Sequence, residues 1–219
     1  MTVLPPASVY THALQGHACT VWEGDLAPQP LPTQAWLAGA GPDDHALLAH
    51  CQGPTIDIGC GPGRMTEALA LAGHTVLGVD VVPEAVRQTH SRGVPALCRS
   101  VFDPVPGEGR WETALLADGN IGIGGDPVAL LDRARELLVP GGRIVVDVAP
   151  WGTGVVTRHV MLETAHGRSG EFAWTSVGAD AIQAVATAAG LGRATGHRYA
   201  DRRWAVIEAG TGAGTEAGT

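Results

Sequence analysis

A glycine-rich segment holds the residues best suited to binding a nucleotide-type ligand. A predicted strand at Thr55–Ile58 leads directly into glycines at positions 59, 61 and 63. Glycine lets the backbone turn sharply and approach a ligand closely. Open α/β sheets bind ligands where the carboxyl end of a strand leads into a helix. The segment therefore predicts a site for a nucleotide-type cofactor.

The spacing of these glycines does not fit a dinucleotide. The dinucleotide fingerprint needs a small residue at its sixth position, and Arg64 occupies that position. Pro62 also removes a backbone N–H that would face a pyrophosphate at the helix N-terminus. The ligand therefore need not be a phosphate ester.

A carboxylate follows the next predicted strand, residues 75–79. Asp80 would lie beside the glycine segment, where it can accept hydrogen bonds from both hydroxyls of a ribose. Alternatively, Asp80 caps the helix that begins after Pro83. The first interpretation predicts a cofactor with a free ribose diol.

From Thr55 onward, short apolar runs alternate with stretches that have a helical pattern. Strands that are apolar throughout and separated by helices indicate a parallel sheet covered on both faces, hence an α/β fold. The predicted strands are residues 55–58, 75–79, 96–98, 113–117, 143–148, 194–199 and 204–209, and the predicted helices are residues 64–72, 83–92, 126–138 and 179–189.

Three motifs together resemble the signature of class I S-adenosylmethionine-dependent methyltransferases. They are the run Asp57–Gly63, the acidic strand end at residues 78–80 and the run Leu138–Gly142. The resemblance implies a Rossmann-like, doubly wound, mostly parallel seven-stranded sheet with helices on both faces. An N-terminal cap and a β-hairpin insertion after strand 5 complete the expected fold. The resemblance also implies an enzyme that binds S-adenosylmethionine and leaves S-adenosylhomocysteine as product. A magnesium-dependent catechol-type enzyme would need carboxylate ligands near Asp118, and the sequence has no second clear set of them, so we expect no metal.

The resemblance assigns cofactor contacts to loops at the carboxyl ends of successive strands. The glycine segment would line the methionine part, Asp80 would hold the ribose, and the loop at residues 100–102 would cover the adenine. Many members of the family carry an acid where Ser100 stands, so its absence leaves the adenine to the Val101 amide and the Phe102 ring. The expected cofactor-binding residues are Asp57, Gly59, Cys60, Gly61, Gly63, Asp80, Val81, Ser100, Val101, Phe102, Ala117 and Asp118.

The chain divides by composition into three parts. Residues 1–52 are rich in proline, which breaks long elements, and we interpret them as an N-terminal cap segment. Residues 53–209 are the expected methyltransferase domain. Within it, residues 151–177 form a substrate-covering insertion whose two apolar segments predict a hairpin. Residues 210–219 lack apolar anchors, so we expect a disordered tail.

The acceptor site is expected at the exit of the fourth predicted strand and under the insertion. Asn120 stands in a glycine-rich exit, where it positions an acceptor or only completes a turn. His159 is the candidate catalytic base, because a neutral imidazole can take the proton of an attacking hydroxyl; a structural or exposed histidine is the alternative. Tyr10 of the cap, Asn120 and His159 are the candidate substrate contacts.

Composition limits the partners. The net charge is −8, whereas nucleic-acid binding rests on clustered cations, so we expect no nucleic-acid partner. The four cysteines lack the spacing of a zinc site or a disulfide framework. No segment has the pattern of a signal peptide or a membrane span, so we expect a cytoplasmic protein without a membrane partner. All basic residues are arginines, which is typical of a GC-rich bacterial genome.

These observations predict methyl transfer to an oxygen or nitrogen atom of a small-molecule metabolite. One alternative is an aminopropyl-type transferase on the same fold, which would need further acidic residues near Asp118 to bind a polyamine. The other is a non-catalytic partner or regulatory subunit that binds the cofactor. Acceptor and oligomeric state have no signal in the sequence.

Overall fold

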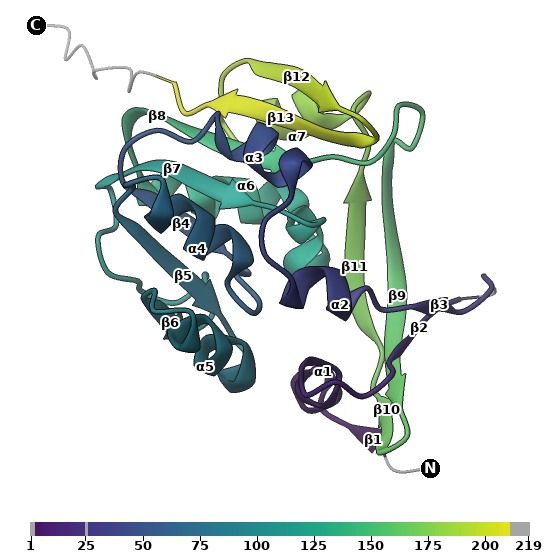
Figure 1. The fold of residues 1–219 in the computed structure, drawn as a ribbon. Coiled ribbons are helices and arrows are strands. Elements are labelled where there is room, and N and C mark those ends of the chain that lie inside the picture. The colour runs from purple at the N-terminus through teal and green to yellow at the C-terminus, as the bar shows by residue number, and fades with distance from the viewer. Residues whose placement is uncertain (1–2, 25, 211–219) are drawn as a thin grey trace, which may run out of the picture.

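The computed structural model describes residues 3–24 and 26–210, and its core is a seven-stranded sheet (Figure 1). The sheet runs in the order β12 (Ala194–Tyr199), β13 (Arg202–Glu208), β8 (Leu138–Asp147), β7 (Trp111–Leu116), β4 (Thr55–Ile58), β5 (Val76–Asp80) and β6 (Ala96–Cys98). The strands from β8 to β6 are parallel, whereas β13 pairs antiparallel with β8, and β12 pairs antiparallel with β13. The predicted α/β class and mostly parallel sheet are confirmed.

Helices cover both faces of this sheet because its strands alternate apolar side chains between two cores. One core contains Ile56 and Val146 and packs against α6 (Pro127–Leu137) and α7 (Ile182–Ala188). The other core contains Val145 and packs against α3 (Pro42–Leu48) and α4 (Arg64–Leu71). Helix α5 (Pro83–Ser91) lies beside β5 and β6.

Helix α6 begins as the local sequence requires. The side chain of Asp126 accepts hydrogen bonds from the backbone N–H groups of Val128 and Ala129, both at 3.0 Å. Pro127 occupies the first helical position, where its missing N–H costs nothing. A 3₁₀ segment, η1 (Asn120–Gly125), precedes this cap and connects it to β7.

The cap and the insertion form a second sheet, of six strands. Strand β9 pairs antiparallel with β2, β10 and β11, and β1 pairs parallel with β10. The strands are β1 (Val3–Leu4), β2 (Thr20–Glu23), β3 (Gln29–Pro30), β9 (Val155–Thr164), β10 (Gly167–Ser169) and β11 (Phe172–Val177). The hairpin expected after strand 5 is present, but its pairing with the cap was not predicted.

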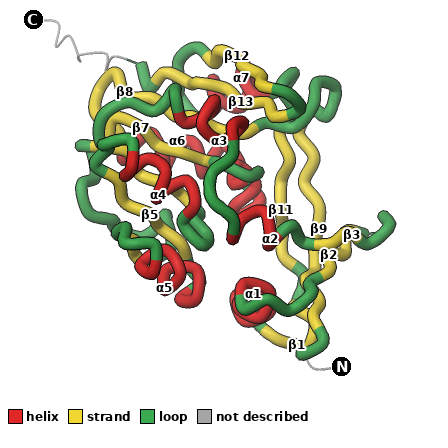
Figure 2. The backbone as a smooth tube through the Cα atoms, in the orientation of Figure 1, coloured by secondary structure: helices red, strands yellow, loops and turns green. Residues whose placement is uncertain are grey.

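Two further helices complete the cap. Helix α1 (Pro6–Leu14) was not predicted; it starts at a proline and buries Val9, Ala13 and Leu14. Helix α2 (Thr33–Leu37) follows β3. Strands β9 and β11 stand opposite the carboxyl ends of the central parallel strands, with α1 and α2 beside them (Figures 1 and 2). Of the predicted tail at residues 210–219, residues 211–219 lie outside the described residues.

Candidate cofactor and acceptor site

A cavity of about 600 Å³ lies between the carboxyl edge of the central sheet and the sheet formed by cap and insertion. Its walls come from the loops after β4, β5, β6 and β7, from α1 and α2, and from β2, β9 and β11. A concave pocket at the carboxyl ends of parallel strands is the usual ligand site of an open α/β sheet. Of the predicted site residues, Tyr10, Asp57, Gly59, Cys60, Gly61, Asp80, Val81, Ser100, Val101, Ala117, Asp118 and Asn120 line the cavity.

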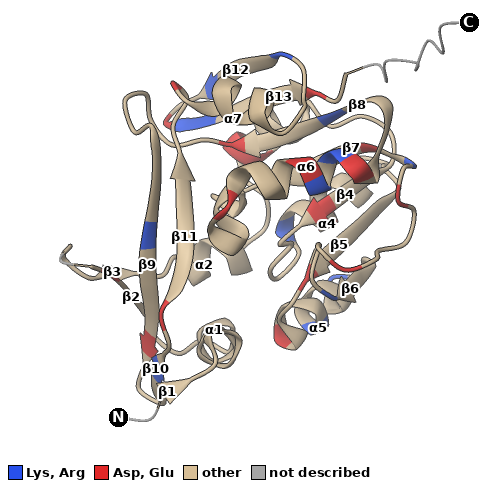
Figure 3. Ribbon diagram, turned by 180° about the vertical axis from the view of Figure 1, so that it is seen from behind, with Lys and Arg blue, Asp and Glu red and all other residues tan. Residues whose placement is uncertain are grey.

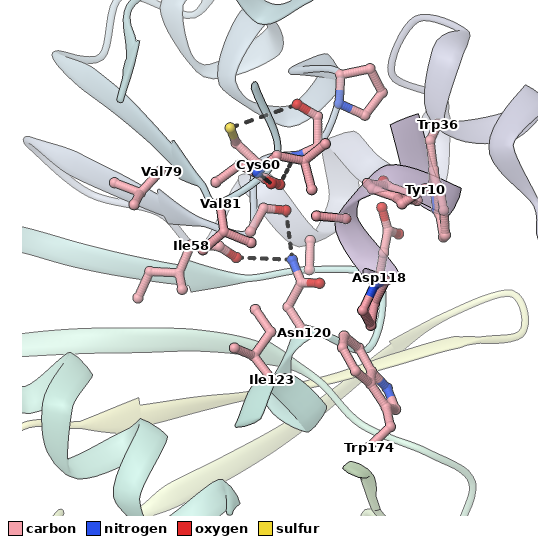
Figure 4. Close-up of a pocket in the computed structure, with 18 of the residues that line it drawn as sticks. Tyr10, Trp36, Ile58, Cys60, Val79, Val81, Asp118, Asn120, Ile123 and Trp174 are labelled. Carbon is pink, nitrogen blue, oxygen red and sulfur yellow. Dashed lines mark hydrogen bonds between the residues drawn. The ribbon is translucent and has the colours of Figure 1, made fainter. Parts of the chain in front are cut away.

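The glycine loop and Asn120 hold each other in place. The Nδ2 group of Asn120 donates to the carbonyl oxygens of Ile58 and Gly59, both at 2.9 Å (Figure 4). Gly59 has a φ of +74°, and a Cβ built on it would lie 2.7 Å from Asn120 Nδ2. Only glycine therefore permits this contact. The side-chain oxygen of Asn120 is turned away from the loop, toward Asp118 and Trp174 (Figure 4).

Asp80 is held by backbone amides beside the glycine loop. Its two oxygens accept hydrogen bonds from the N–H groups of Gly61 at 2.9 Å and Val82 at 2.8 Å. Burial raises the pKa of the Asp80 carboxyl, and these two N–H groups act in the opposite direction. Val82 is the N-cap of α5 and lies outside the helix, so Asp80 does not bond the first helical amides. Each carboxylate oxygen keeps a free lone pair for a ribose hydroxyl.

Asp57 and Cys60 contribute buried groups to the loop. The hydroxyl of Thr66 donates to Asp57 Oδ2 at 2.7 Å, and burial raises the pKa of Asp57 to about 7. The thiol of Cys60 packs against Gly78, where a Cβ would lie 2.8 Å from its sulfur. Burial also raises the pKa of the Cys60 thiol, so the sulfur stays protonated and is a packing group.

Two arginines and three aspartates form an ion-pair network at the cavity wall. Arg64 Nη2 donates to both oxygens of Asp118 at 2.7 Å, and Nη1 of Arg64 pairs with Asp44. Arg202 contacts the same Asp118 at 3.2 Å and also pairs with Asp44 and Asp147. Both arginines therefore contact Asp118, although their two charges are shared among at least three carboxylates.

At the end of the cavity next to β5 and β6, apolar side chains lie beside the polar residues Arg99 and Ser100. Val81 and Val101 line it together with Ile123, which was not among the predicted residues. Phe102 was expected to cover the adenine, but its side chain is 47% exposed and does not line the cavity. The expectation for Phe102 is corrected, because the turn after Val101 directs this ring toward Gly124 instead.

Gly63 was predicted to bind the cofactor but does not line the cavity. It is the N-cap of α4, in the left-handed conformation with a φ of +86°. A Cβ at this position would lie 2.6 Å from the hydroxyl oxygen of Thr89. Its glycine therefore allows the close packing of α4 on α5.

Four aromatic side chains line the end of the cavity next to the cap and insertion: Tyr10, Trp36, Phe172 and Trp174. Burial and the nearby Asp80 carboxylate raise the pKa of Tyr10, so its hydroxyl stays neutral. Sequence analysis found only Tyr10 of these four. The available signal was strand alternation, since Phe172 and Trp174 share a face of β11.

The structure does not bring His159 to the cavity. Alternation along β9 directs Val160 and Leu162 into the cavity lining, while His159, paired with Ala173, lies exposed on the opposite face. The alternation predicted along β9 is correct. The face that carries His159 was expected to meet the substrate, but the opposite face lines the cavity. His159 therefore has no contact with reacting atoms here. Within residues 3–24 and 26–210, no group of His, Cys, Asp or Glu side chains is arranged to hold a metal ion.

Comparisons with known proteins agree with this geometry. Residues 56–142 match a family described as a methyltransferase domain. A ubiquinone biosynthesis O-methyltransferase of Xylella fastidiosa is 30% identical over 98 residues, which are 42% of this chain and 40% of that protein. A trans-aconitate 2-methyltransferase of Delftia acidovorans is 32% identical over 117 residues, 50% of this chain and 42% of that protein. The chain thus spans less than half the length of these relatives.

A solved structure shares nearly the whole architecture. The S-adenosylmethionine-dependent methyltransferase of Bacteroides fragilis, solved with S-adenosylhomocysteine, has a TM-score of 0.79 at 20% identity. The match covers 94% of this chain and 97% of that one. The chain therefore carries a methyltransferase domain at residues 56–142 and has the fold of the class I S-adenosylmethionine-dependent methyltransferases. The prediction of a methyltransferase domain on this fold is confirmed.

Proposed function

We propose that this protein transfers the methyl group of S-adenosylmethionine to an oxygen or nitrogen atom of a small molecule. One observation carries the proposal: a single cavity joins the Asp80 carboxylate and the glycine loop to the aromatic lining under the cap. A cofactor held at one end and an acceptor at the other would therefore meet inside one enclosed space.

The chain's own groups fit the cofactor. Asp80 is oriented by two backbone amides and keeps acceptor capacity for a ribose diol. Gly59 and Gly61 leave the loop surface free of side chains, and Val81 and Ile123 supply apolar surface for a base. S-adenosylmethionine bound there would supply an electrophilic methyl group to the acceptor and would leave S-adenosylhomocysteine as the product.

Positioning and exclusion of water are the proposed contributions of the protein to the rate. Displacement at a methyl carbon is fast when the two reacting atoms are held about 3 to 3.5 Å apart. The aromatic residues of α1, α2 and β11 would hold the acceptor, and the second sheet would keep water out. A dedicated base is optional for this chemistry, so the exposed position of His159 does not count against it.

The ion pairs of Asp118 disfavour the aminopropyl alternative. A polyamine is a multiply charged cation and needs uncompensated carboxylates. Asp118 is hydrogen-bonded by Arg64 and Arg202, so a polyamine would have to displace a guanidinium to pair with it.

The test is turnover with methyl-labelled S-adenosylmethionine and an extract of small metabolites from a GC-rich bacterium. We expect label in an extractable small molecule. Asp80→Ala should reduce this label at least about tenfold at limiting cofactor, because a buried ribose hydroxyl pair would lose its acceptor. His159→Ala is the matched control and should keep most of the activity. A wild-type protein that binds the cofactor but labels nothing would favour the non-catalytic alternative.

A further inference from the structure

We propose that the acceptor is an uncharged, planar aromatic molecule carrying a hydroxyl or a ring N–H, held between two aromatic pairs of the cavity. This inference rests on the proposed methyl transfer and adds to it the chemical class of the substrate.

The two aromatic pairs come from different parts of the chain. Tyr10 of α1 and Trp36 of α2 pack edge to face, with ring centroids 6.1 Å apart at 68°. Phe172 and Trp174 of β11 pack in the same way, at 6.4 Å and 86°. In Figure 4, Trp174 lies across the cavity from Tyr10 and Trp36. An edge-to-face pair leaves ring faces that its own partner does not cover.

Aliphatic side chains line the same cavity beside the aromatic residues. Val21 of β2 is the pairing neighbour of Leu162 of β9, and both line the cavity with Leu31 and Val160. Apolar side chains exposed to water in an empty cavity are unfavourable, and covering them with an apolar ligand lowers the free energy. The lining therefore matches a flat apolar body.

Arg64 and Arg158 are already paired with carboxylates, and Arg99 stands away from the aromatic residues, which argues against an anionic acceptor in the aromatic part. Arg64 is paired with Asp44 and Asp118. Arg99 stands after β6, at the far end of the cavity, and donates to the carbonyl of Pro104 at 2.6 Å. Arg158 pairs with Glu23 at 2.6 Å. A carboxylate or phosphate in the aromatic part would lose its water without gaining a free cation.

The carboxylates already have hydrogen-bond partners as well, so a cationic acceptor would have to displace one of these partners. Asp118 is shared by two arginines, and Glu23 is paired with Arg158. Asp80 is held by amides beside the proposed ribose position. Burial raises the pKa of Asp57 to about 7, so this group carries only part of a charge at neutral pH. The lining therefore favours an uncharged acceptor.

Two neutral polar groups remain to orient such a molecule. The side-chain oxygen of Asn120 faces the cavity (Figure 4) and can accept from a hydroxyl or ring N–H. The Tyr10 hydroxyl lies over Gly61, where a Cβ would be 3.5 Å from its oxygen. The phenol can donate to an oxygen or nitrogen of the acceptor. These groups give the site direction without adding charge.

The experiment measures binding to protein saturated with S-adenosylhomocysteine, by titration calorimetry. The uncharged aromatic probes are 2-naphthol and indole; the charged probes are trans-aconitate and spermidine. We expect the aromatic probes to bind at least tenfold more tightly than either charged probe. Trp174→Leu should weaken 2-naphthol binding about three- to tenfold, the loss expected for one aromatic contact. Trp174→Phe should restore most of it.

Trp151→Leu is the matched control, because Trp151 is 78% exposed and does not line the cavity. Equal 2-naphthol affinity in Trp174→Leu and wild type, with the circular dichroism spectrum unchanged, overturns the inference. Tighter binding of trans-aconitate or spermidine than of both aromatic probes also overturns it. If S-adenosylhomocysteine binds and only a charged aliphatic acceptor is methylated, the proposed methyl transfer stands and the aromatic class fails. If S-adenosylhomocysteine itself does not bind, the proposed function fails first.

Discussion

At the residue scale, Asp57 couples protonation to folding. Its side chain is 1% exposed and has one hydrogen bond from a side chain, that of Thr66. Burial raises the pKa of Asp57 from 3.8 to about 7. The folded protein therefore keeps a proton on Asp57 that the unfolded chain loses near pH 4. Between these two pH values, the free energy of unfolding falls as the pH rises.

Asp57→Asn should remove this dependence, because an amide keeps the shape and cannot ionise. We expect the variant to gain stability relative to wild type between pH 5 and pH 8, by about 1 to 3 kcal/mol, since each pKa unit is worth about 1.4 kcal/mol. Urea unfolding of both proteins at the two pH values measures this difference. The matched control, Asp103→Asn, changes an exposed carboxyl. A gap between wild type and Asp57→Asn that stays the same at both pH values would contradict the account.

Some site residues could be predicted because a local pattern identifies them. Asp80 follows a buried strand and Gly59 begins a loop, and both positions can be read from neighbouring residues. His159 could not be placed in the same way. Alternation along a strand tells which residues share a face but not which face meets the cavity. That choice depends on β2 and β11, which pack on β9 from distant parts of the chain.

At the element scale, Arg202 connects four segments. It donates to both oxygens of Asp147 at the end of β8, at 2.9 and 2.5 Å, and contacts Asp118 after β7 at 3.2 Å. It also pairs with Asp44 of α3. The strand that carries Arg202 is thereby tied to the cap and to the carboxyl edge that forms the cavity wall.

Arg202→Ala should destabilise the protein by about 3 to 5 kcal/mol, because it leaves buried carboxylates without their partner. Arg135→Ala is the control, since Arg135 forms an exposed pair with Asp132; such a pair is worth about 1 kcal/mol or less. Urea unfolding at pH 7 compares the two variants. Losses of equal size would show that the network contributes no more than a surface ion pair.

The second sheet shows why elements are easier to predict than their pairing. Strand β9 lies within residues 151–177, where two apolar segments predicted a hairpin. Its partner β2 is short and comes from a distant part of the chain. Trp22 of β2, whose indole N–H donates to Glu163 of β9, is 141 positions from Glu163 in the sequence. No local pattern carries that information. Helix α1 was missed for a related reason, since prolines suggested a break where one of them starts the helix.

At the scale of the whole molecule, the order of elements determines where the cavity forms. The central strands end in four loops at one edge, and the cap and insertion form a sheet that faces this edge. The parallel core was predictable because its strands are apolar throughout and separated by helices. The cavity's shape was not, because it needs the second sheet. On the face seen in Figure 3, acidic and basic segments are interspersed. In the part of the chain that the structure describes, no helix is long and apolar enough to cross a membrane.

The central claim is that Asp80 and the glycine loop bind S-adenosylmethionine, and titration calorimetry tests it most directly. We predict micromolar-class binding of S-adenosylmethionine and S-adenosylhomocysteine to the wild-type protein, and none of NAD. Asp80→Ala should raise both dissociation constants about 5- to 150-fold, the equivalent of about 1 to 3 kcal/mol, while Asp103→Asn should leave them unchanged. Binding of NAD in place of both sulfur compounds, or equal affinity in Asp80→Ala and wild type, would contradict the account.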